Sequence, residues 1–217
     1  HLGISIGHQG MEQTAQKAIA LLYSRTNVLF SQFQHVYWRI RYNLFRTFCL
    51  HLYGCEVWDI THSACVSFCT AVRKCSRKVL GLPYRTHCRY LPYLAEDYPV
   101  ELKICLRIIG FLWSAGQSNN SIIKLCHALV SNGSSSSIGR TVSKLAEITR
   151  FSREQLLVGT NPGKSHIKSK LFEHFIEDVP NDLISVISEL LDVSHGDFDI
   201  NLDANEISFL IDDLCTS

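Results

Sequence analysis

The amino-acid sequence predicts a mainly α protein: a helical bundle with one short strand at the N-terminus and an acidic helical tail at the C-terminus. Three observations predict this fold class. Apolar residues recur at spacings of three and four over most of the chain, as on the buried face of a helix. Only the first few residues alternate weakly, as a strand does. The last part of the chain combines short amphipathic segments with many acids and has no Lys or Arg.

The first half of the chain is expected to contain the strand, at Leu2–Ile6, followed by helices. Gly81–Arg85 is expected to be a turn, because a glycine followed by Leu82 and Pro83 ends a helix. A short helix should follow the turn even though it contains a proline. The helical patterns span residues 11–33, 36–53, 62–80 and 87–95.

The second half of the chain is also predicted to be helical. Pro99 starts a helix that ends near Gly116, and Asn119 or Asn120 caps the next helix, which runs to residue 131. A polar run separates that helix from another at 137–151. The glycines and proline of residues 159–166 mark a boundary. Short acidic helices are expected beyond it, over residues 171–176, 183–191 and 207–214.

Aromatic and basic residues crowd the helix predicted over residues 36–53. Its apolar stripe is expected at Val36, Ile40, Leu44, Phe48 and Leu52. Arginines bind phosphates through paired donors, and aromatic rings stack on bases. We therefore expect the arginines to contact a phosphate backbone, with Trp38 and Tyr42 mostly buried; the alternative is that the arginines only face water. These arginines are Arg39, Arg41 and Arg46.

The helix predicted over residues 62–80 carries cations on the back of an apolar stripe. Its four cations form two pairs one turn apart, 73/77 and 74/78, and like charges at this spacing repel. An anionic partner explains such a helix most simply, and the segment after the turn adds further donors. The stripe is Cys65, Phe68, Cys69, Val72, Cys75 and Val79. The candidate donors are Arg73, Lys74, Arg77, Lys78, Arg85, His87 and Arg89.

The net charge of +1 conceals two parts of opposite sign. All 21 Lys and Arg lie at or before Lys170 together with eight acids, which gives 21 − 8 = +13. From Leu171 to Ser217 there are 12 acids and no Lys or Arg, which gives −12. A positive body suits a polyanion. The acidic tail suits a basic partner or an intramolecular contact with the body, or it only adds solubility.

Two patterns that suggest metal or nucleotide binding have simpler explanations. His62, Cys65, Cys69 and Cys75 are ligand-type residues, but their spacing is that of a helix stripe, so we expect ordinary buried thiols and no metal site. The sequence GTNPGKS at Gly159–Ser165 ends like a P-loop, yet valine stands at position 158, where that loop needs its first glycine. We therefore expect a linker there and no cofactor.

The cysteines and the apolar runs predict a location inside the cell. The nine cysteines are an odd number at irregular spacing, and no secretory signal precedes them, so we expect reduced thiols. No apolar run approaches the roughly 20 residues of a membrane span, so no membrane partner is expected. These features favour an intracellular protein of the nucleus or the cytoplasm.

Two phrases in the sequence resemble one protein family. LFRTFCLHLYGCEVW at Leu44–Trp58 and AVRKCSRKVLGLPYRTH at Ala71–His87 are similar, in wording and order, to the C-terminal part of the reverse transcriptase of non-LTR (LINE-type) retrotransposons. His1–Ile6 looks like the family's strand that closes the palm and leads into the thumb. Ile123–Cys126 and Asn132–Ser136 also resemble the family. The resemblance covers roughly residues 1–151, the thumb and post-thumb region.

The resemblance implies an RNA-directed DNA polymerase as the parent protein but no catalysis by this chain alone. The family holds two metal ions on palm aspartates, one set of which precedes the strand that resembles His1–Ile6. Because the chain starts at that strand and with a histidine, we expect a part of a longer product without catalytic residues. Asp212 and Asp213 follow a phenylalanine near the C-terminus, on the wrong side of the thumb, so we do not expect them to bind catalytic metal.

Together these inferences predict four segments. They are the end of a palm-like strand (1–10), a basic helical thumb-like and post-thumb domain (11–158), a linker (159–170) and an acidic helical tail (171–217). The expected function is binding of the backbone of RNA and DNA, above all an RNA–DNA duplex. The alternative is a degenerate or domesticated helical protein-interaction module whose acidic tail contacts a basic partner.

Overall fold

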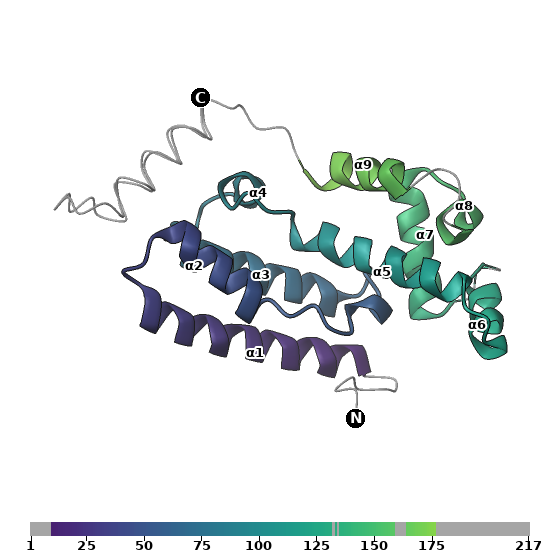
Figure 1. The fold of residues 1–217 in the computed structure, drawn as a ribbon, viewed down its shortest axis with the longest axis horizontal. Coiled ribbons are helices and arrows are strands. Elements are labelled where there is room, and N and C mark those ends of the chain that lie inside the picture. The colour runs from purple at the N-terminus through teal and green to yellow at the C-terminus, as the bar shows by residue number, and fades with distance from the viewer. Residues whose placement is uncertain (1–9, 132, 134, 159–163, 177–217) are drawn as a thin grey trace. The chain divides into compact units, whose positions relative to one another are not determined.

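A computed structural model of the protein describes residues 10–131, 133, 135–158 and 164–176. This part of the chain is mainly helical and contains no strand, which confirms the predicted class (Figure 1). The strand predicted at Leu2–Ile6 and the acidic segments predicted beyond residue 176 lie outside the described residues.

The described residues divide into two compact units, and each is considered by itself. We call the first the α5 unit; it takes residues 10–16, 52–69 and the described part of 99–176. We call the second the α2 unit; its described residues are 17–51 and 70–98. Helices α1 (Gly10–Phe33) and α3 (Ser63–Leu80) contribute residues to both units.

In the α5 unit, α6, α8 and α9 pack against α5, and α7 packs against α6, α8 and α9 (Figure 1). The indole Nε1 of Trp113 on α5 donates a hydrogen bond to the carbonyl of Leu156 at 2.7 Å, and Ile167 and Leu171 of α9 are fully buried. Asn120 caps α6 as predicted, because its Oδ1 accepts hydrogen bonds from the backbone N–H groups of the next helix's first turn. The helices are α5 (Val100–Gly116), α6 (Ser121–Ser131), α7 (Ser137–Thr149), α8 (Arg153–Val158) and α9 (Lys164–Phe175).

A buried carboxylate anchors the segment before α3 to α7. Asp59 is 1% exposed, and its Oδ1 accepts hydrogen bonds from the backbone and hydroxyl of Thr61. Its Oδ2 accepts a 2.6 Å bond from Nε of Arg140, whose side chain is half exposed. Burial alone would raise the pKa of Asp59, but the hydrogen bonds from Thr61 and Arg140 outweigh it and hold the pKa below its ordinary value.

In the α2 unit, α1, α2 (Trp38–Leu44) and the second half of α3 lie side by side (Figure 1). The last turn of α3 ends in a Schellman motif, as the sequence predicts: the N–H of Leu82 bonds to the carbonyl of Arg77, the N–H of Gly81 bonds to that of Lys78, and Gly81 has φ of 75°. The predicted short helix is present as a 3₁₀ turn at Cys88–Tyr90 followed by α4 (Leu91–Leu94).

The helix predicted over residues 36–53 is shorter than expected, and its buried face is different. After α2 the chain makes one π-helical turn, Phe45–Cys49, and leaves the helix at Leu50. The buried face runs one residue later than the predicted stripe from α2 onward, so that Cys49 is 3% exposed and Phe48 is 61% exposed. The predicted stripe was therefore wrong at Ile40 and Phe48. The buried residues are Trp38, Arg41, Tyr42, Phe45 and Cys49.

The predicted linker is also partly helical. Residues 164–175 form one helix, α9, which crosses the boundary expected between Lys170 and Leu171. Helix α9 is stabilised by the burial of Ile167 and Leu171, which lie one turn apart and are both buried in the α5 unit.

Replacing Asp59 with Asn should reduce the free energy of unfolding by about 2 kcal/mol near neutral pH, because it removes a charge-assisted hydrogen bond at a buried group. The folded pKa of Asp59 is depressed, so its contribution is present above the unfolded pKa of about 4 and is lost as the pH falls through the folded pKa. Urea unfolding at several pH values should show the difference from wild type shrinking in acid. Glu147→Gln, which removes an exposed ion-pair partner of Lys144, is the matched control and should have little effect. A deficit of equal size at all pH values would contradict this role of Asp59.

Candidate nucleic-acid interface

The α2 unit carries most of the positive charge of the described chain. Its two sequence ranges contain eleven Lys and Arg and only two acids, which gives +9. The ranges of the α5 unit contain ten Lys and Arg and seven acids, which gives +3. Such an excess needs counter-charge from outside the unit, from solvent ions, from another part of the chain or from a ligand.

The four cations predicted on α3 lie off its buried stripe, as expected, in two rows. Lys78 belongs to the row toward α1: its Nζ donates a hydrogen bond to Asn27 at 2.9 Å and lies 5.0 Å from the ring centroid of Phe30. Arg77 belongs to the row toward the following turn: its Nε donates to the carbonyl of Thr86 at 2.7 Å. Lys74 and Lys78 are exposed, while Arg73 and Arg77 are half-buried. Arg77 and Lys78 therefore also hold the fold together.

The segment after α3 brings further donors close to this helix. Arg85 is exposed and its Nε donates to the hydroxyl of Tyr84, a side chain that is 78% exposed. His87 is exposed and its Nδ1 accepts a hydrogen bond from the backbone of Arg89. Arg89 is half-buried against Tyr90. Because Arg77 bonds to Thr86, the structure places this segment beside the end of α3.

Arg41 does not lie on this surface, contrary to its prediction as a phosphate ligand. It is 2% exposed, and its guanidinium donates to the carbonyl of Val79 at 2.5 Å and to that of Gln34 at 2.7 Å. Burial lowers the pKa of Arg41 from its ordinary value, although a guanidinium remains protonated in proteins. Arg41 is thus a structural cation, because the stripe shifted by one residue places it in the core.

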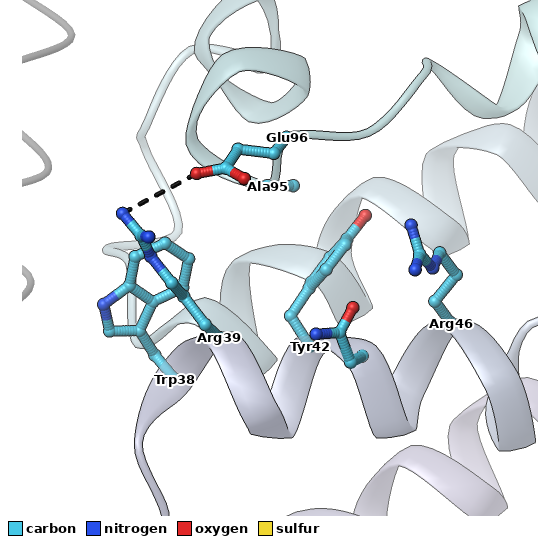
Figure 2. A pocket seen from close by; sticks show the side chains of 7 residues that line it. Trp38, Arg39, Tyr42, Arg46, Ala95 and Glu96 are labelled. Atoms are coloured by element: carbon cyan, nitrogen blue, oxygen red, sulfur yellow. Dashed lines mark ion pairs between the residues drawn. The ribbon is translucent and has the colours of Figure 1, made fainter.

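Arg39 on α2 and Arg46 in the π-helical turn after it are exposed, and both border a pocket of about 180 Å³ (Figure 2). Arg39 stacks 5.0 Å from the ring centroid of Trp38 and pairs with Glu96 at 3.6 Å. Arg46 lies 3.9 Å from Asp97. As expected, the aromatic rings are buried: Trp38 is 2% exposed, and burial raises the pKa of Tyr42. The pocket is lined by Trp38, Arg39, Tyr42, Asn43, Arg46, Ala95 and Glu96.

The two acids of the α2 unit were not predicted to pair with its arginines. Glu96 and Asp97 are the only carboxylates in its ranges, and each faces an arginine of α2. Their isolation in a long basic stretch was visible in the sequence. Their partners were not, because α2 and the segment after α4 are separated by more than fifty residues.

The cysteine and histidine cluster predicted to be ordinary buried thiols has no metal-binding arrangement within the described part of the chain. Cys65, Cys69 and Cys75 are buried, and Nδ1 of His62 accepts a hydrogen bond from the backbone of Ala64. Burial also raises the pKa of Cys105 to about 12, which keeps this core thiol protonated. Most of the P-loop-like sequence at Gly159–Ser165 lies outside the described residues.

Comparison of the chain with protein-family models, with curated proteins and with solved structures gives no match. None of the helices in the described ranges has the length and hydropathy that a bilayer crossing requires.

Replacing Arg41 with Gln should reduce the free energy of unfolding by about 2–3 kcal/mol, because it leaves the carbonyls of Val79 and Gln34 without their charged donor. The exposed Lys74 offers a matched control: Lys74→Gln should change stability by less than about 0.5 kcal/mol. Thermal or urea unfolding of both variants provides the measurement. Equal stabilities would mean that the guanidinium of Arg41 is in solvent.

Proposed function

We propose that this chain binds the sugar–phosphate backbone of nucleic acid through the α2 unit, in the way that its resemblance to a non-LTR reverse-transcriptase thumb implies. The ligand is an RNA–DNA duplex, held without reading its sequence. The observation that carries this proposal is the charge of the unit's described residues: eleven cations with two acids, which face Arg39 and Arg46.

The arrangement of the cations supports an extended anion as the ligand. Two rows of like charge run along α3, and each i, i+4 pair costs the isolated helix roughly 0.2–0.5 kcal/mol. A phosphate backbone relieves this repulsion, because it places repeated negative charges along the rows. Arg73 and Arg77 are half-buried, and a long side chain of this type can cover apolar surface with its stem while its charge faces water. Backbone contacts of this kind set the position of a duplex and carry no sequence information.

The proposed activity is binding and not polymerisation. In the family that the chain resembles, the palm carries the metal-binding aspartates, and the thumb grips the template–product duplex while the palm copies RNA into DNA. The α2 unit would provide that grip through Lys74, Arg73 and the segment around Arg85.

One observation favours the alternative, a helical protein-interaction module. Helix α6 exposes large apolar side chains along most of its length, and such surfaces mark protein contacts. In this second proposal a protein partner covers α6. The acidic segment beyond residue 176, which the alternative also invokes, lies outside the described residues. The exposed side chains are Ile122, Leu125 and Leu129, at 72%, 62% and 55%.

Binding of a short RNA–DNA hybrid should weaken steeply with salt, by about 0.9 log units per log unit of salt for each phosphate neutralised. The double variant Arg73→Gln, Lys74→Gln should reduce the salt slope by about 2, because it removes two cations from the α2 unit while Arg77 and Lys78 keep their structural bonds. Fluorescence anisotropy at several salt concentrations measures both quantities.

The matched control removes two cations from the α5 unit, by Lys124→Gln and Lys144→Gln, and should leave the slope close to that of wild type. Affinity independent of salt would contradict electrostatic backbone binding. Equal losses in the two double variants would mean that the α2 unit is not the binding surface.

A further inference from the structure

We propose that the pocket beside α2 is a subsite for one backbone phosphate, and that the carboxylate of Glu96, which pairs with Arg39 in the free protein, competes with this phosphate for Arg39. The inference rests on the proposed function, because the phosphate belongs to the nucleic acid that the α2 unit would bind. It adds a specific site and a residue that sets its affinity.

The pocket presents two guanidinium groups on the same side of α2. Arg39 and Arg46 are seven residues apart, about two helical turns, and Figure 2 shows Tyr42 between Arg39 on α2 and Arg46 in the π-helical turn after it. The exposed amide of Asn43 lies at the same rim. The pocket has a volume of about 180 Å³. This is several times the roughly 30 Å³ that one molecule takes up in liquid water, so an anion of phosphate size fits.

Arg39 is held in place before any ligand binds. Its guanidinium lies 5.0 Å from the ring centroid of Trp38, and that ring is 2% exposed and cannot move freely. A guanidinium fixed in this way presents its paired donors in one orientation. Phosphate oxygens match such a pair better than a single carboxylate oxygen at the end of a flexible side chain.

The two carboxylates next to these arginines differ in how firmly they are held. The side chain of Asp97 is 8% exposed; it accepts a hydrogen bond from the hydroxyl of Tyr42 at 3.3 Å and one from the backbone of Tyr98 at 2.9 Å. The side chain of Glu96 is 71% exposed, and its oxygen lies 3.6 Å from Arg39, well beyond the 2.7–2.9 Å of a charge-assisted hydrogen bond. Asp97 is therefore a fixed part of the fold, and Glu96 is exchangeable.

The backbone conformation places Glu96 where its carboxylate can compete with a phosphate for Arg39. Glu96 has φ of 49°, in the left-handed region that side chains other than glycine, asparagine and aspartate seldom adopt. At this position, after α4, its side chain points toward Arg39 (Figure 2). A phosphate that bonds to Arg39 replaces the ion pair with the Glu96 carboxylate, most of which already lies in solvent. Glu96 therefore lowers the affinity of the site without blocking it.

The test compares Glu96→Gln with Glu147→Gln, each of which removes one negative charge from an exposed ion pair. Glu147 lies in the α5 unit, so its variant controls for the change in net charge. At low salt, Glu96→Gln should bind a short RNA–DNA hybrid about threefold more tightly than wild type, since an exposed pair no longer competes. The gain should disappear in the background of Arg39→Ala. A gain no larger than that of Glu147→Gln, or one that persists without Arg39, would overturn the proposal.

A second measurement tests the subsite independently of nucleic-acid binding. Titration of the full chain with inorganic phosphate, followed by NMR at the side-chain Nε–H of Arg39, should shift this signal at lower phosphate concentration in Glu96→Gln than in wild type. No shift in either protein would reject the subsite. A shift of Arg39 together with no binding of the hybrid would reject the proposed function and leave the subsite standing.

Discussion

The buried guanidinium of Arg41 is the interaction on which the α2 unit depends. The guanidinium of Arg41 donates hydrogen bonds to the carbonyl of Val79, in the last turn of α3, and to the carbonyl of Gln34, which follows α1. Carbonyls at the end of a helix have no partner within the helix, and leaving them buried and unpaired is expensive. The neighbouring carbonyls of Arg77 and Lys78 are taken by the turn at Gly81. A cation in the core therefore completes the end of α3 and ties it to α2.

This arrangement explains why so much charge can be carried by a small unit. Arg77 and Lys78 each use a hydrogen bond to fix a neighbouring segment, so the cations of α3 are part of the fold as well as of its surface. Glu96 and Asp97 offset the arginines of α2, while the rows on α3 keep a net positive field. Such a surface attracts a polyanion over distances up to the Debye length, about 10 Å at 0.1 M salt.

The sequence predicts the regular helices well and the departures from them poorly. The stripe of α3 is fully buried, Gly81 ends that helix, and Asn120 caps α6, because each of these depends on local spacing or a local residue type. The buried face of residues 38–49 depends on tertiary packing, and it includes Phe45 and Cys49 where the sequence pattern predicts Leu44 and Phe48. Arg41 lies on that buried face, although its sequence context is that of a surface arginine. The pocket beside Arg39 could not be predicted, because Glu96, which lines it, follows α4 and lies far from Arg39 in the sequence. No local sequence pattern indicates that these two residues pair.

The most direct test of the central claim, that the α2 unit is the nucleic-acid surface, is lysine footprinting of the full chain. Lysines are acetylated with and without a saturating RNA–DNA hybrid, and the modified sites are quantified by mass spectrometry. Lys74 of the α2 unit should be strongly protected by the hybrid, whereas Lys124 and Lys144 of the α5 unit should react as in the free protein. Protection of Lys124 and Lys144 with none at Lys74 would contradict the claim.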